Sequence, residues 1–205
     1  YEEILKEAGI CFLFAQKYHI AMRDISPVRK ELGVRTIFNL LGPLTNPAGA
    51  KYQLLGVYYK ELVEPLANVL NKLGSKKAWV VHGEDGLDEI TVTGKTYVAE
   101  LDDGKVSTFT INPSDYGIRT YSKGDLAGSD PKYNAREILS LFSGKEGAYR
   151  DIVIINSAAA LVVSGKAKNL EDGIKIAKKS IDSGEARKKL EKLVEVSNKF
   201  LVKSD

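Results

Sequence analysis

Apolar residues recur at helical spacing over several stretches of the chain. Residues 1–9 have the pattern of the end of a helix that Gly9 closes, and Glu61–Leu73 has that of an amphipathic helix. Further helices are predicted in which Ser26 and Asn169 serve as N-terminal caps. These further segments are Ser26–Leu32, Asp130–Gly144, Tyr149–Ser164, Asn169–Gly184 and Glu185–Leu201.

Two of these helices differ in how apolar they are. Tyr149–Ser164 is too apolar for a surface helix, so we predict that it lies centrally. Glu185–Leu201 is amphipathic and is expected to pack one face on the core. The side chains expected on that face are Leu190, Leu193, Val194 and Phe200.

Two apolar runs flank the amphipathic helix and predict a parallel pair of strands. Tyr52–Tyr59 precedes Glu61–Leu73, and Lys77–His82 follows it. A strand–helix–strand order of this kind forms a parallel crossover. Ligands bind at the carboxyl ends of such strands, which here means near His82 and Gly83.

Shorter runs complete the predicted sheet. Glu89–Val92, Thr96–Leu101 and Lys105–Ile111 form an expected antiparallel meander, with turns at Gly94 and at Asp103-Gly104. A further buried strand is predicted over Cys11–Ala15. The fold class predicted is therefore α/β, with a central mixed sheet flanked by helices.

Composition narrows the class of protein. The chain has 205 residues, which corresponds to one domain or one and a half, and its net charge of +3 is low for a dedicated nucleic-acid-binding protein. No apolar run reaches the roughly 18 residues of a membrane span, and the first residues of this sequence lack the basic-then-apolar pattern of a signal peptide. The single Cys11 rules out an intramolecular disulfide and favours a reducing, cytoplasmic location. Because the sequence begins at Tyr1 inside a helix, we expect it to be part of a longer chain.

The segment from Val28 to Pro47 concentrates cations near a helix end. Arg29 lies in the short helix and Arg35 just beyond it, before an apolar stretch with Gly42-Pro43 and Asn46-Pro47 pairs that are candidate turns. A guanidinium matches a carboxylate bidentately, so both arginines are candidate anion ligands. Surface ion pairs are the alternative for each.

The loop from His82 to Glu89 is the most acidic in the chain. Its adjacent Asp88 and Glu89 can converge only if the backbone bends, and Gly86 makes a bend easy. Oxygen ligands that share a cation with a ligand's phosphates are typical of a magnesium site. The alternative is a solvated acidic turn.

Other reactive residues are few. His19 follows the first predicted strand and is either a substrate-positioning or proton-shuttling group or a hydrogen-bonded structural residue, and the same alternatives apply to His82. Cys11 is expected to be packed. No Walker loop, GxGxxG, CxxC or HExxH motif is present.

Taken together, these segments resemble anthranilate phosphoribosyltransferase. The resemblance is carried by Phe12–Met22, Pro27–Pro47, His82–Glu89 and the Asn156–Ala160 run on the apolar helix, the second being the most specific. It extends over essentially the whole chain and corresponds to about the C-terminal three-fifths of that enzyme, of an archaeal or thermophilic type.

This resemblance implies a nucleoside-phosphorylase-like fold and transfer of the 5-phosphoribosyl group of phosphoribosyl diphosphate (PRPP) to anthranilate in tryptophan biosynthesis. It implies Mg²⁺ as cofactor, a homodimer, and no nucleic-acid or membrane partner. Arg29 would hold the anthranilate carboxylate, with His19, Gly42 and Pro43 lining the anthranilate channel. Asp88 and Glu89 would bind the metal ions. No catalytic residue is assigned.

One part of the family pattern is not found in the 205 residues. The Gly-Thr-Gly-Gly-Asp loop that holds the phosphates and the Lys-His-Gly-Asn segment are both missing from the sequence. Residues 1–205 would thus form a partial catalytic domain without most of the helical dimerisation domain, and we expect little activity from them alone. Two rival interpretations are a pyrimidine nucleoside phosphorylase and a nucleic-acid-binding paralogue of the same fold.

Overall fold

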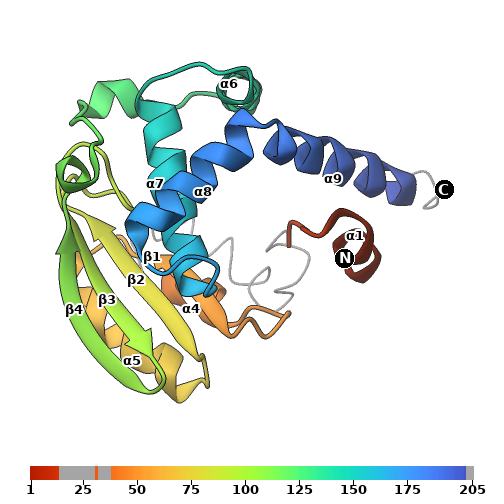
Figure 1. The fold of residues 1–205 in the computed structure, drawn as a ribbon. Coiled ribbons are helices and arrows are strands. Elements are labelled where there is room, and N and C mark those ends of the chain that lie inside the picture. The colour runs from red at the N-terminus through yellow and green to blue at the C-terminus, as the bar shows by residue number, and fades with distance from the viewer. Residues whose placement is uncertain (14–30, 32–37, 202–205) are drawn as a thin grey trace. The chain divides into compact units, whose positions relative to one another are not determined.

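The strands form a mixed sheet in the order β1-β2-β3-β4 (Figure 1). The computed structural model describes residues 1–13, 31 and 38–201. β1 (Tyr52–Gly56) and β2 (Lys77–Gly83) are parallel, which confirms the predicted crossover. β3 (Thr96–Asp102) and β4 (Lys105–Ile111) follow in antiparallel pairing. The mixed α/β class is therefore confirmed, although β1 ends three residues before the predicted Tyr59.

The β3–β4 hairpin closes through the turn that the sequence predicted. Asp103 and Gly104 have φ values of 45° and 84°. Positive φ at both central residues defines the type I′ turn, whose twist matches that of the flanking strands. Asp and Gly tolerate this conformation better than other residues do, so the Asp-Gly pair fixes the hairpin register.

Helices cover both faces of the central strand. β2 is buried along nearly its whole length. α5 (Val63–Lys72), which follows the short 3₁₀ turn η1 (Lys60–Leu62), packs on β2 and β3, and α7 (Ala148–Val163) packs on β1 and β2. Burying each large apolar side chain in these layers contributes about 1.5–3 kcal/mol.

The prediction that Tyr149–Ser164 is central is confirmed. Nine of the sixteen residues of α7 are buried. α8 (Leu170–Asp182) packs closely on it, because Gly173 lies where a Cβ would be 2.7 Å from the Ala158 carbonyl oxygen. Buried Arg150 joins the same two helices through a 2.5 Å bond to Asp182.

Side-chain caps begin two of the predicted helices. The Asp130 carboxylate accepts a 2.7 Å hydrogen bond from the Tyr133 amide at the start of α6 (Pro131–Phe142). The Asn169 side chain accepts one of 2.9 Å from the Asp172 amide at the start of α8. Short 3₁₀ turns, η2 and η3, occupy Pro113–Tyr116 and Lys123–Leu126.

The chain divides into two units, of which residues 50–183 form the one described so far and residues 1–49 and 184–205 the other. In the second unit α1 (Glu2–Ala8) packs on α9 (Glu185–Leu201), with Ala8 and Val196 fully buried between their neighbours. As predicted, Gly9 ends α1, with a φ of 75°. Within the described part of the chain, none of the helices combines the length and apolarity needed to cross a membrane.

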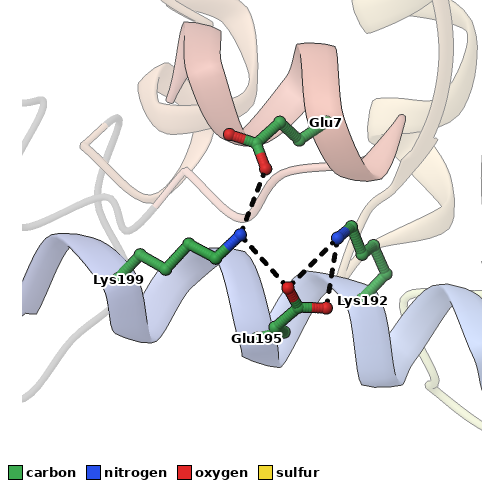
Figure 2. A network of polar contacts seen from close by, with 4 residues as sticks. All are labelled: Glu7, Lys192, Glu195 and Lys199. Carbon is green, nitrogen blue, oxygen red and sulfur yellow. Dashed lines mark hydrogen bonds and ion pairs between the residues drawn. The ribbon is translucent and has the colours of Figure 1, made fainter.

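An exposed ion-pair network runs along α9 and reaches α1 (Figure 2). Lys199 lies 3.1 Å from Glu195 and 3.5 Å from Glu7, and Lys192 also pairs with Glu195 at 3.1 Å. All four side chains are substantially exposed, so solvent screens these pairs. The packing of α1 on α9 therefore depends more on apolar burial. It also depends on the Lys189 ammonium, which donates to the Ala8 carbonyl at 3.0 Å.

Two predictions in this unit are wrong. Cys11–Leu13, the described part of the expected strand Cys11–Ala15, is not in a strand, and Phe12 is 77% exposed. On α9, Val194 is 51% exposed whereas Val196 is fully buried. The buried stripe thus follows the i, i+3 spacing from Leu190, which continues through the half-buried Leu193 to Val196 and leaves Val194 outside.

The Gly-Pro and Asn-Pro pairs behave differently. Gly42 and Pro43 lie inside the helix α4 (Phe38–Leu44), so the expected Gly-Pro turn is wrong. Proline has no backbone N–H, so Pro43 cannot make the hydrogen bond to the carbonyl four residues earlier that other residues inside a helix make. Asn46 does begin a turn, in which its side chain accepts from the Ala48 amide at 2.9 Å and its carbonyl from the Gly49 amide at 3.0 Å.

Candidate functional site

The acidic loop follows the carboxyl edge of the parallel strand pair. β1 ends at Gly56 and β2 at Gly83, and residues 84–95 then connect β2 to β3. The backbone turns back at Gly86, where φ is 95° and the amide donates to the Gly83 carbonyl at 2.8 Å. The sequence indicated that Gly86 would make a bend easy, and the chain does turn here and then crosses the end of β1.

The loop can cross the end of β1 only because the last residue of that strand, Gly56, has no side chain. A Cβ built on Gly56 would lie 1.5 Å from the carbonyl oxygen of Asp88 and 2.4 Å from its carbonyl carbon. Real Cβ contacts do not come this close, so the Asp88 backbone occupies the space of the missing side chain. The acidic pair is thereby fixed against the edge of the sheet.

Asp85 organises the inside of the loop. Its carboxylate accepts hydrogen bonds of 2.6 Å from each of the Thr91 and Thr93 hydroxyls, and one of 3.1 Å from the Leu87 amide. Burial acts to raise the pKa of Asp85, but these bonds outweigh it and hold the pKa below its ordinary value. Asp85 is thus an ionised structural residue and not a solvated turn carboxylate.

Replacing Asp85 with Asn is expected to destabilise the protein by about 1–3 kcal/mol, because two hydroxyl donors lose their charged acceptor. The pKa of Asp85 is lowered on folding, so its contribution is fully present above its unfolded pKa of about 3.9 and is lost as the pH falls through the folded value. Urea unfolding between pH 3 and 7 measures this. The Asp85→Asn curve should therefore be flatter in acid, whereas the control Glu84→Gln, an exposed loop residue, should follow the unchanged protein. Equal acid sensitivity of Asp85→Asn and the unchanged protein would contradict this role.

Asn156 of α7 binds the backbone of Ile90, the residue that follows the acidic pair. Its Oδ1 accepts from the Ile90 amide at 2.9 Å, and its Nδ2 donates to the Ile90 carbonyl at 2.8 Å. The Thr91 amide donates to the Thr96 hydroxyl at 3.0 Å. The backbone groups of Ile90 and Thr91 therefore bond to side chains and not to a neighbouring strand. The predicted strand Glu89–Val92 is wrong for this reason.

The side chains of Asp88 and Glu89 themselves are exposed. Partial desolvation by the surrounding chain, with the charges of Asp88 and Asp85, raises the pKa of Glu89. Among the described residues, no group of three His, Cys, Asp or Glu side chains lies close enough to hold a metal ion. The pair therefore offers hard oxygen ligands that leave most of a cation's coordination to other donors.

His82 has a structural role. Its Nδ1 donates to the Val57 carbonyl at 2.7 Å, and the side chain is buried, so it joins the ends of β1 and β2 beneath the loop. On the outside of the loop, Lys123 donates to the Asp85 carbonyl at 2.6 Å, and Lys95 pairs with Glu84 at 3.3 Å. The structural alternative for His82 is the one that the geometry favours.

The other predicted site residues either belong to the other unit or lie outside the described residues. His19, Arg29 and Arg35 lie outside the described residues. Gly42 and Pro43 lie in α4, in the unit of residues 1–49 and 184–205, whereas the acidic loop lies in the unit of residues 50–183.

Sequence reasoning assigned no role to Gly56 or to Asn156. The sequence signals for them are weak: a glycine at the end of a predicted strand, and a lone amide in an apolar helix.

The fold and the loop define a known class of protein. Residues 1–187 match the family described as the glycosyl transferase family, a/b domain, and the chain belongs to this family. It is similar to anthranilate phosphoribosyltransferases: 55% identical over 196 residues to that of Methanobrevibacter smithii and 53% over 196 residues to that of Xanthobacter autotrophicus. These matches cover 96% of this chain but 58% and 57% of the two relatives.

Solved structures agree. The crystal structure of anthranilate phosphoribosyltransferase from Thermus thermophilus superposes with a TM-score of 0.87 at 41% identity, covering 94% of this chain and 57% of that one. The Saccharomyces cerevisiae enzyme in complex with PRPP and Mg superposes with a TM-score of 0.80 at 35% identity, covering 86% and 51%. The chain thus spans little more than half the length of the proteins it matches.

Proposed function

We propose that the protein containing these residues transfers the 5-phosphoribosyl group from PRPP to anthranilate, giving N-(5-phosphoribosyl)anthranilate and diphosphate. The observation that carries the proposal is the exposed Asp88–Glu89 pair, fixed by backbone contacts at the carboxyl edge of β1 and β2. Support comes from the shared family and from relatives of the transferase name at more than 50% identity. These names do not favour the phosphorylase and nucleic-acid alternatives.

The donor set at this edge fits Mg²⁺. Magnesium takes oxygen ligands, keeps several waters and is bound by one or two carboxylates together with substrate phosphates. Asp88 and Glu89 offer two such carboxylates, and among the described residues they are not part of a group of three His, Cys, Asp or Glu side chains that could hold a metal ion. When bound, Mg²⁺ would offset the negative charge of the diphosphate. Partial burial is the main cause of the raised pKa of Glu89, and the charges of Asp88 and Asp85, which raise it further, also favour a cation beside it.

For this reaction the protein mainly has to bind the two substrates and orient them. Diphosphate departs as a highly charged group and leaves positive charge on the ribose, so electrostatic stabilisation of departing charge is the largest available contribution. Asp88 and Glu89 would hold the metal-bound diphosphate, while Arg29 would hold the anthranilate carboxylate and keep the amine in line. No covalent enzyme intermediate is required.

Anthranilate consumption in the presence of PRPP and Mg²⁺ tests the proposal. We expect turnover from the protein as the cell makes it, and loss of turnover when Mg²⁺ is chelated. Residues 1–205 assayed alone should be far slower, because the phosphate-binding glycine loop of the family is not among them. Phosphorolysis of thymidine without anthranilate turnover would contradict the proposal in favour of a phosphorylase. The homodimer and the cytoplasmic location remain predictions, and analytical ultracentrifugation checks the first.

Arg29→Ala is expected to raise the KM for anthranilate by roughly 10- to 100-fold, because a charge-assisted bidentate bond is worth about 1.5–3 kcal/mol. The KM for PRPP should change less than twofold. Arg29→Lys keeps the charge but loses the planar fork, so it should recover only part of the affinity. Steady-state kinetics with each substrate varied in turn measures both effects. Equal increases in the two KM values would show that Arg29 does not bind anthranilate.

A further inference from the structure

Asn156 and the acidic loop are 66 residues apart in the sequence but joined by a two-way amide contact. The side chain both accepts from the Ile90 amide and donates to the Ile90 carbonyl, as a neighbouring strand would. A third bond of 2.9 Å, from Nδ2 to the Ile152 carbonyl one turn earlier in α7, fixes the side-chain rotamer. Asn156 is thus held by its own helix while it holds the loop.

This contact sits directly beside the acidic pair. Ile90 follows Glu89, and its side chain is fully buried. On the other side of the pair, the Asp88 carbonyl rests against Gly56. The backbone of the two acidic residues is therefore fixed at both ends, while their carboxylates remain exposed.

Asparagine suits this position for a chemical reason. Both backbone groups of a buried residue need partners, and an amide is a side chain that can donate and accept at once. Aspartate has no donor for the Ile90 and Ile152 carbonyls, and alanine leaves the Ile90 amide and carbonyl without partners.

We propose that Asn156 is a positioning residue that keeps Asp88 and Glu89 where they can share a divalent cation with the diphosphate of PRPP. The inference rests on the proposed function, because it assigns the pair its ligand. Some residues orient metal ligands without contacting the metal, and removing them typically lowers metal affinity or activity by about 10- to 100-fold. Asn156 would act in this way through the backbone of Ile90 and would not touch the substrate itself.

The test compares Asn156→Ala with a matched control. Asn71 of α5 likewise joins a helix to a turn, because its Nδ2 donates to the Gly104 carbonyl at 3.0 Å in the β3–β4 hairpin. We expect the Mg²⁺ concentration for half-maximal rate to rise about 10-fold or more in Asn156→Ala, with the KM for anthranilate within twofold. In Asn71→Ala the Mg²⁺ requirement should not change. If this Mg²⁺ concentration rose equally in both variants, or rose in neither of them, the inference would be overturned.

A second measurement needs no catalysis. Amide hydrogen exchange of Ile90 in the unliganded protein should be about five- to tenfold faster in Asn156→Ala and unchanged in Asn71→Ala. Absence of turnover in the unmodified protein would count against the proposed function alone. Unchanged Ile90 exchange in Asn156→Ala would count against Asn156 as a positioning residue, whatever the activity.

Discussion

Neutralising Asp88 and Glu89 together, as Asp88→Asn with Glu89→Gln, is expected to lower kcat/KM for PRPP by on the order of 10²–10³-fold. Both substitutions keep the shape of the side chains and remove only the charge. Because the carboxylates are exposed, folding should be little affected. The loss should therefore reflect weaker stabilisation of the departing diphosphate, with a higher Mg²⁺ requirement and an anthranilate KM within twofold. Steady-state kinetics at several Mg²⁺ concentrations measures these quantities.

Glu84→Gln is the control for that experiment. Glu84 lies in the same loop and is exposed, but it pairs with Lys95 at the surface. Its replacement should leave the Mg²⁺ titration unchanged. If the double variant titrated like Glu84→Gln, the acidic pair would have no part in metal binding.

Gly56→Ala is expected to cost about 3 kcal/mol or more in the free energy of unfolding, and to abolish most of the proposed transferase activity. The added Cβ would lie 1.5 Å from the Asp88 carbonyl oxygen, and a backbone atom cannot swing aside as a flexible side chain can. Overpacking of this kind typically costs 1–3 kcal/mol, and occasionally more. The loop must shift to relieve it, which displaces Asp88 and Glu89. Urea unfolding and Mg²⁺-dependent kinetics measure the two effects.

Gly124→Ala is the matched substitution at a tolerant site. A Cβ on Gly124 would meet only the Ser122 hydroxyl, at an ordinary 3.6 Å. We expect a change within about 0.5 kcal/mol, as for most surface substitutions. If Gly56→Ala were equally mild, the close approach of Asp88 to β1 would not be a constraint on the loop.

Local signals predicted the elements whose structure is decided locally. Asp103-Gly104 fixed the hairpin because those two residues accept positive φ. Asn169 began α8 because its side chain satisfies the Asp172 amide. The apolarity of Tyr149–Ser164 placed α7 in the core. In each case the cause lies within a few residues of the effect.

The errors arose where distant side chains decide the local structure. Glu89–Val92 has the composition of a strand, but the Ile90 amide is taken by Asn156, and the Thr91 amide by Thr96. Val194 was expected on the core-facing side of α9, but the buried position is Val196, two residues further on, and a shift of this size cannot be read from a mixed apolar pattern.

The candidate site was predicted in part. The acidic pair and the bend at Gly86 followed from the sequence of the loop itself. The contacts of Gly56 and Asn156 could not be read from the sequence, because their partners lie 32 and 66 residues away. Arg29 and His19 lie outside the described residues, so their roles stay predictions.

The most direct measurement is a crystal structure of the protein, as the cell makes it, with PRPP, anthranilate and Mg²⁺ bound. We predict Mg²⁺ at about 2.1 Å from a carboxylate oxygen of Asp88 or Glu89 and from a diphosphate oxygen. We also predict the Arg29 guanidinium on the anthranilate carboxylate. Diphosphate and its metal bound by other residues, with both acidic side chains facing bulk water, would contradict the proposed site.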